Sequence, residues 1–281
     1  MLRILVDGSA DMPENWIEDY QLNILPMPIQ FGSKTYYQGE DLTQELFYEL
    51  TDKTENHPQS AAPSPERIKA FIEKVSEIGD TVLSLNVSGH MSSTITMVRN
   101  AANALKEKIS VIPFDSQAGS AALGFLAREA RLREQAGQTI DEILAALSEL
   151  RDKIMIVLTV DDLDYAHRSG RVSLLKKTLT TLMDIKPIIT LQEGLLNVAS
   201  VTRTRKKSME RLVSLVKAHF DGIKVKVAVV HAQDRESAKV LKSMVEKALD
   251  CSEIILTELS LAVAANLGPK TIGLVAIPDK V

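Results

Sequence analysis

Short apolar runs alternate with amphipathic stretches along the whole chain. Runs at 2–6, 81–85, 109–114, 154–160, 225–230, 253–259 and 272–278 have the length of buried strands. Stretches at 13–20, 43–51, 65–78, 95–105, 121–133, 139–151, 161–168, 174–183, 205–220 and 234–249 have the apolar spacing of helices. Strands that alternate with helices are typical of α/β folds, in which helices cover a largely parallel sheet.

Two further segments look like hairpins. Residues 23–31 and 34–38 flank a turn at Gly32, and residues 185–191 and 195–201 flank a turn at Gly194. Residues 262–270 are mostly small and contain Pro269, so we expect a turn region there.

The pattern predicts two mixed α/β domains. We place the boundary before Lys153, so that residues 1–152 form an N-terminal domain and residues 153–281 a C-terminal domain. No linker rich in proline or glycine marks this position. The first domain is expected to hold a largely parallel sheet flanked by helices.

Three strand-to-helix turns of the first half carry small polar residues. Residues 86–94 connect one strand to a helix, and residues 7–9 and 115–120 repeat the arrangement. Because ligands of open parallel sheets bind beyond the carboxyl ends of the strands, we expect these turns to share one edge. Hydroxyls and unpaired backbone N–H groups at a helix start favour an anion such as a carboxylate. The alternative is that Ser92 or Ser93 only caps the helix.

Composition narrows the class of protein. The 281 residues are 45% hydrophobic and 25% charged, with a net charge of −4, and the basic residues are interspersed with acidic ones, so no nucleic-acid surface is expected. The single Cys251 excludes an internal disulfide and favours a reducing cytoplasm. The apolar run at the N-terminus is short for a signal peptide, and no run approaches the roughly 20 residues of a membrane span. We expect a cytoplasmic protein.

Enzyme motifs are weak in this chain. Ser88-Gly89-His90 lacks the flanking glycine of a hydrolase elbow, and neither glycine-rich nucleotide motif is present. Aspartates at strand ends are explained by capping, so we expect no metal site. A small-molecule phosphotransferase or hydrolase that uses the same loops as an anion site stays open as the alternative.

Several motifs together resemble the DegV family, two-domain bacterial proteins that bind a fatty acid in a tunnel between the domains. The resemblance rests on residues 7–9, 60–64, 91–94, 115–116, 169–173, 185–188, 203 and 268–269, in that order along the chain. It implies a non-catalytic carrier without a cofactor, whose ligand is a long-chain fatty acid. Characterised members of the family present the carboxylate to a partner fatty acid kinase.

The resemblance also implies the residues of the site. Ser60 and Ser92 stand where the family holds the fatty-acid carboxylate, and Arg171 and Arg203 would supply positive charge near the head-group opening. The remaining candidates are residues of the same loop and of the C-terminal turn, namely Ser88, Ser93, Thr94 and Asn266.

The chain departs from the family pattern around the head group. Ser93 replaces a glycine, Ala61 and Ala62 replace Ser-Gln, Asn266 replaces a histidine found in many members, and Lys270 replaces a glycine. These departures leave two alternatives open. The ligand is a different acyl compound, or the protein works without a partner kinase.

Overall fold

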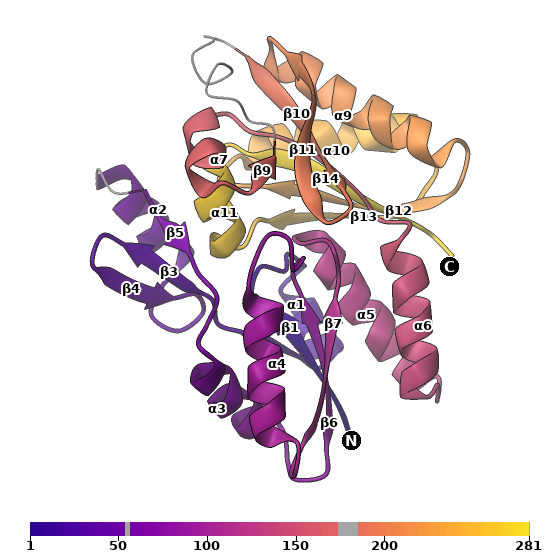
Figure 1. The fold of residues 1–281 in the computed structure, drawn as a ribbon. Helices are drawn as coiled ribbons and strands as arrows, with labels where there is room; N and C mark the ends of the chain where they lie inside the picture. The colour runs from indigo at the N-terminus through magenta and orange to yellow at the C-terminus, as the bar shows by residue number, and fades with distance from the viewer. Residues whose placement is uncertain (54–56, 174–184, 281) are drawn as a thin grey trace.

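The structure is a computed structural model that describes residues 1–53, 57–173 and 185–280. The helix expected at 174–183 lies outside these residues. The chain forms a four-stranded, a three-stranded and a seven-stranded sheet, with helices packed against them (Figure 1).

The four-stranded sheet belongs to the first half of the chain. Its order is β2-β1-β6-β7, and all its neighbours are parallel. The strands are β1 (Leu2–Asp7), β2 (Leu22–Leu25), β6 (Thr81–Asn86) and β7 (Ser110–Asp115). The helices of this half are α1 (Asn15–Asp19), α2 (Gln44–Lys53), α3 (Pro65–Val75), α4 (Thr94–Leu105), α5 (Ala121–Gln135) and α6 (Ile140–Arg151). The predicted parallel sheet is therefore confirmed.

Side-chain alternation explains how helices cover both faces of this sheet. Leu5 and Val82 point to the face covered by α3 and α4, where they form one buried cluster with residues such as Ile68. Ile4 and Leu83 point to the opposite face, toward α5 and α6. Strands buried on both faces explain the continuous apolar runs in the sequence.

The seven-stranded sheet belongs to the second half. Its order is β13-β12-β14-β8-β10-β11-β9. The strands are β8 (Met155–Thr159), β9 (Val172–Ser173), β10 (Lys186–Gln192), β11 (Leu195–Thr202), β12 (Val225–His231), β13 (Cys251–Glu258) and β14 (Ile272–Pro278). The helices are α7 (Leu163–Ser169), α9 (Arg205–Phe220), α10 (Arg235–Ala248) and α11 (Leu261–Leu267). The hairpin expected around Gly194 is present as β10 and β11.

The two faces of the seven-stranded sheet pack against different parts of the chain. Val157 and Val227 pack under α9 and α10 in a separate cluster. Ile156 and Val230 face the first half of the chain and belong to the same buried cluster as Ile4. Figure 1 shows α5 and α6 along one side of the four-stranded sheet and below the seven-stranded sheet. One core thus extends across both halves.

Two predicted elements are only partly correct. The hairpin expected around Gly32 is present as β3 (Pro28–Phe31) and β4 (Lys34–Tyr37). Residues 23–31 do not form one strand, however, because Leu22–Leu25 joins the parallel sheet while β3 pairs with β4 and β5 (Gln59–Ser60) in the three-stranded sheet. Residues 262–270 are not only a turn, because Leu261–Leu267 is the helix α11. Its run of alanines is compatible with close packing against α7 and β5.

Polar contacts also join the halves. Arg128 of α5 donates from Nη1 and Nη2 to the carboxylate of Glu253 on β13, at 2.8 and 2.7 Å. Its guanidinium lies 4.1 Å from the centre of the Trp16 ring.

The large sheets lie on either side of the boundary expected at residues 152 and 153, and the assignment of two separate domains stays a prediction.

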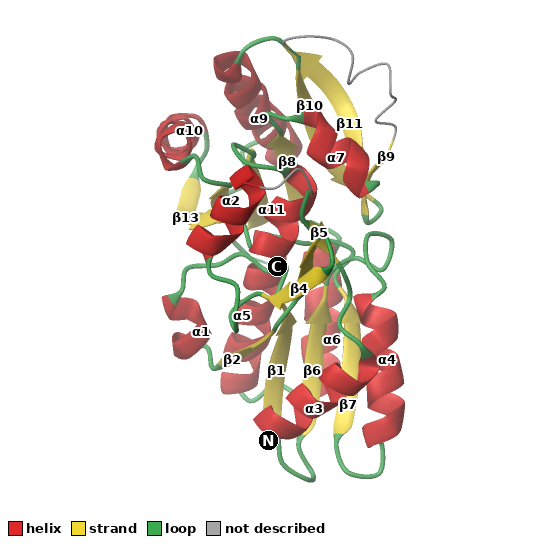
Figure 2. Cartoon of the chain, turned by 90° about the vertical axis from the view of Figure 1, so that its left-hand side faces the viewer, coloured by secondary structure: helices red, strands yellow, loops and turns green. Residues whose placement is uncertain are grey.

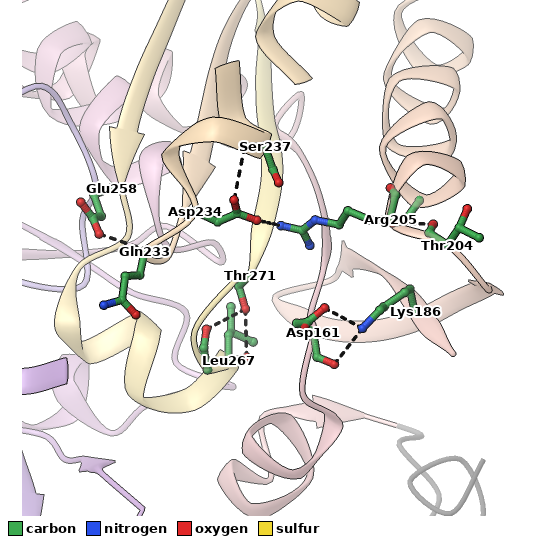
Figure 3. Close-up of polar contacts among 12 residues, drawn as sticks. Asp161, Lys186, Thr204, Arg205, Gln233, Asp234, Ser237, Glu258, Leu267 and Thr271 are labelled. Carbon is green, nitrogen blue, oxygen red and sulfur yellow. Dashed lines mark hydrogen bonds and ion pairs between the residues drawn. The ribbon is translucent and has the colours of Figure 1, made fainter. Parts of the chain in front are cut away.

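One of the cations at the start of α9, where the helix dipole disfavours positive charge, has a partner at the start of another helix. Arg205 Nη2 lies 2.6 Å from Asp234 Oδ2, and Asp234 also caps α10 through the N–H of Ser237 (Figure 3). A nearby carboxylate offsets the unfavourable helix dipole. Arg205 therefore joins two helix starts.

Candidate functional site

An apolar cavity lies where the two halves meet. It contains about 770 Å³ of space between atoms, part of it open to solvent. The seven-stranded sheet contributes side chains such as Ile156, and α11 contributes Val263. The full lining is Ser9, Met27, Ser60, Ala61, Val87, Met91, Ser92, Gly119, Ser120, Ile156, Leu158, Arg171, Leu191, Leu196, Ala262, Val263, Asn266 and Leu267. Most of these side chains are aliphatic, as expected for a ligand with an apolar body.

A polar hollow adjoins the cavity. Its lining includes His57, Tyr165 and Arg168, and it shares Ser60, Arg171 and Asn266 with the apolar cavity. These three shared residues therefore mark the boundary between an apolar interior and a polar opening. A ligand with an apolar tail and a charged head would place the head at this boundary.

Ser60 is held at the boundary by two elements. It ends β5, which pairs with Ile29 of β3, and its Oγ accepts a hydrogen bond of 2.8 Å from Asn266 Nδ2. The same amide group donates to the carbonyl oxygen of Ala262 at 2.7 Å. Because Asn266 fills an acceptor position of the Ser60 hydroxyl, the hydroxyl hydrogen is left to donate to a ligand.

Ser92 lines the inner cavity beside α4. Its Oγ accepts from the backbone N–H of Thr94 at 3.2 Å and lies 2.9 Å from Thr94 Oγ1. Thr94 is fully buried and lines neither hollow. Thr94 therefore orients Ser92, and Ser92 carries the hydroxyl that faces the cavity.

The expected cluster of unpaired backbone N–H groups is not present in residues 88–92. Ser88 N donates to Ala118 O, Gly89 N to Asp115 Oδ1, and His90 N to Ser88 Oγ. The N–H groups of Met91 and Ser92 both donate to Ser88 O. This part of the loop closes on itself, and the hydroxyl of Ser92 is the polar group that it presents to the cavity.

Ser88 has a structural contact in place of the predicted ligand contact. It is fully buried, and its Oγ donates to the carbonyl oxygen of Gly194 at 2.7 Å, which ties the loop to the β10–β11 turn. Ser93 is exposed at the start of α4 and lines neither hollow. Arg203 is exposed in the turn between β11 and α9 and also lines neither hollow. The structure does not bring these three residues to the boundary, so their predicted roles in binding stay predictions.

Arg171 supplies positive charge at the boundary. Gly170 ends α7 with a φ of +67°, a left-handed conformation that suits glycine, and it turns the chain so that Arg171 reaches both hollows. Arg171 Nη1 donates to Ser169 O at 2.6 Å, and burial lowers the pKa of the guanidinium. The group still carries its charge at neutral pH.

Sequence reasoning missed much of the cavity wall. Ser9 and Ser120 follow β1 and β7, the neighbours of the predicted loop, and both line the cavity. Ser9 is buried and supplies a further hydroxyl to the cavity wall. The parallel order of the strands had placed the turns at 7–9 and 115–120 at this edge, which the structure confirms, although neither serine was among the named candidates.

Comparisons with known proteins agree with this geometry. A model of the DegV family, described as uncharacterised protein, matches residues 1–279. The curated Protein DegV of Bacillus subtilis is 28% identical over 249 residues, which cover 88% of each chain. A solved DegV family structure from Thermus thermophilus, described by its fatty acid binding, has a TM-score of 0.90 at 26% identity and covers 99% of both chains. The DegV structure from Bacillus subtilis, described as a fatty acid binding protein, has a TM-score of 0.86 at 25% identity over 99% of both chains.

The fold and the site define a class of α/β protein with an apolar cavity between two sheets and a polar opening at one end. The family match covers nearly the whole chain. The protein belongs to the DegV family. In the described ranges, no helix has both the length and the apolar character needed to cross a membrane.

Proposed function

We propose that the protein is a non-catalytic carrier of a long-chain fatty acid. The acyl chain occupies the apolar cavity, and Ser60 and Ser92 hold the carboxylate. The observation that carries the proposal is the position of Ser60, which lies at the boundary of both hollows and is oriented by Asn266. The relatives from Thermus thermophilus and Bacillus subtilis, both described as binding fatty acids, support the same ligand class.

The apolar tail supplies most of the binding free energy. Burying roughly 15 methylenes at about 0.8 kcal/mol each gives about 12 kcal/mol before the costs of ordering. The hydroxyls of Ser60 and Ser92 therefore need only to make binding selective for a free carboxylate. They suit this role because hydrogen bonds to a charged group are stronger than hydrogen bonds between neutral groups. Arg171 adds a positive charge at the opening.

The opening also supports delivery of the carboxylate to a partner, for which a fatty acid kinase is the candidate. Ser60 and Arg171 line the outer hollow as well as the cavity, so a head group bound there is accessible from outside.

The cytoplasm is the proposed compartment. Cys251 is a free thiol, and burial first, then the nearby Asp250 and Glu246, raise its pKa to about 11.

The test is native mass spectrometry of the purified protein, followed by denaturation and organic extraction. We expect one fatty acid per chain, either co-purified or taken up from a mixture of free acids. A protein that stays empty after incubation with that mixture would rule the carrier out. Turnover of a small phosphate ester or acyl ester by the protein alone would favour the enzyme alternative. Addition of a bacterial fatty acid kinase and ATP to the loaded protein tests the delivery step separately.

A further inference from the structure

A second hollow region lies away from the fatty-acid cavity. Two adjoining hollows, with about 880 and 640 Å³ of space between atoms, share Gln44 and Glu258. They lie between α1, the start of α2 and the end of β13, which are on the same side of the molecule in Figure 2. We call the two hollows together the acidic groove.

The groove carries one sign of charge. Its carboxylates come from the connection between β1 and α1, from α2 and from the end of β13, and no lysine or arginine is among the described residues that line it. One of them, Glu49, is paired with Lys53 at 2.5 Å, and another, Glu258, accepts a hydrogen bond from Gln233 N at 3.1 Å (Figure 3). The acidic residues of the groove are Glu14, Glu45, Glu49, Asp52 and Glu258, together with Asp11, whose pKa burial raises to about 7.

One buried hydroxyl in the groove, that of Tyr48, has no hydrogen-bond partner among the described residues. Tyr48 is 6% exposed and lines the smaller hollow. Ser260 is 8% exposed, lines the larger hollow and is hydrogen-bonded to the carboxyl of Asp11. A buried polar group without a partner is unfavourable, and a ligand that supplies the missing hydrogen bond would remove this cost. Burial, with the nearby Glu258 and Asp11 carboxylates, raises the pKa of Tyr48, so its phenol stays neutral.

The larger hollow is also apolar in part. Met12, Ile24 and Leu42 line it, and Ile17 lies at its edge with 38% of its surface exposed. An apolar floor beside a row of carboxylates matches a segment that carries both apolar and cationic side chains. A metal ion is a poorer match, because the described residues include no group of three potential ligands placed to hold one.

We propose that the acidic groove binds a segment of a partner protein that carries lysine or arginine beside apolar side chains. The cations lie against Glu14, Glu45 and Glu258, and the apolar side chains cover Met12 and Ile17. Tyr48 OH accepts a hydrogen bond from a bound ammonium or guanidinium group. The inference stands apart from the fatty-acid site, because the lining of the groove shares no residue with that cavity.

The probe is a fluorescent amphipathic peptide built from lysine and leucine, compared with a glutamate/leucine peptide and a lysine/serine peptide of the same length. Fluorescence anisotropy should show binding of the lysine/leucine peptide only, with an affinity that falls as salt is added. The double variant Glu14→Lys/Glu45→Lys should weaken binding by about tenfold or more, because two exposed attractive charges become repulsive. Tyr48→Phe should weaken it by about fivefold, since one hydrogen bond is lost.

The control is Glu73→Lys/Glu107→Lys, which makes the same change of net charge at two exposed residues outside the groove. It should alter affinity by less than about twofold. Equal weakening by both double variants would show general attraction to an acidic protein and would overturn the proposal. Binding of the glutamate/leucine peptide, or no binding of the lysine/leucine peptide at millimolar concentration, would also overturn it. The fatty-acid content of each variant is measured in parallel, so that failure of the groove and failure of the carrier are distinguished.

Discussion

Asn266 Nδ2 lies 2.8 Å from Ser60 Oγ, although 206 residues separate the two along the chain. This contact joins α11 to β5 at the boundary between the apolar cavity and the polar opening. Asn266 stands where the family resemblance places a histidine, and here its amide orients a hydroxyl. The contact makes the head-group site depend on both halves of the chain.

Ser60→Ala should lower the affinity for a free fatty acid by about ten- to a hundredfold, because a hydrogen bond to a charged carboxylate is lost. The Asn266 amide keeps its bond to Ala262 O in this variant, so it is not left without a partner. Asn266→Ala should have a smaller effect, and the double variant should bind like Ser60→Ala alone, since Asn266 acts through Ser60. Isothermal titration calorimetry of delipidated protein measures all three. Additive effects would mean that Asn266 contacts the ligand independently.

Ser92→Ala should weaken retention of a free acid by about tenfold relative to that of its methyl ester, because the hydroxyl contacts only the charged head. Ser93→Ala is the matched control, since Ser93 is the next residue, is exposed and lines neither hollow. Competition between acid and ester, followed by mass spectrometry, gives the ratio directly. The same ratio in both variants would remove Ser92 from the head-group site.

Gly268→Ala should reduce the free energy of unfolding by about 2–3 kcal/mol. Gly268 has a φ of +81°, and an added Cβ would lie 2.8 Å from the ring of Tyr165, which lines the outer hollow. Gly222→Ala is the control, because Gly222 has a φ of +80° but open space around the added carbon. It should cost about 1 kcal/mol, the backbone strain alone. Urea unfolding compares the two, and equal losses would show that the contact with Tyr165 has no part.

Asp11 should make stability depend on pH. Burial raises the pKa of Asp11 to about 7, although hydrogen bonds from Ser120 and Ser260 oppose the shift. The folded protein therefore binds a proton between about pH 4 and pH 7 that the unfolded chain does not, so this contribution to stability is present at low pH and is lost as pH rises toward 7.

The matched variant is Asp11→Asn, which keeps one acceptor oxygen and cannot ionise. Between pH 7.5 and pH 5 the protein should gain about 2 kcal/mol of unfolding free energy relative to this variant. Urea unfolding at both pH values measures the difference. A parallel pH dependence in the two proteins would show that Asp11 does not titrate in this range.

The sequence alone determined most of the secondary structure and the family. Apolar periodicity is a local property, so it identified the parallel strands around residues 2–6 and 81–85 and the helices that cover them. Two of the helices have local caps, at Ser64 before α3 and at Thr139 before α6. Periodicity failed at residues 23–31, because the apolar alternation continues through Pro26 and Pro28 although the two short strands of this segment belong to different sheets.

Only the tertiary structure decided which polar side chains face the cavity. Ser88 and Ser92 lie in the same loop and have the same chemistry, yet Ser88 donates to Gly194 while Ser92 lines the cavity. The acidic groove likewise combines α1, α2 and the end of β13, which are far apart in sequence. The direction of a side chain in a loop depends on contacts with distant parts of the chain, and no local pattern encodes those contacts. The sequence therefore supplied the candidate hydroxyls, and packing between the two halves selected among them.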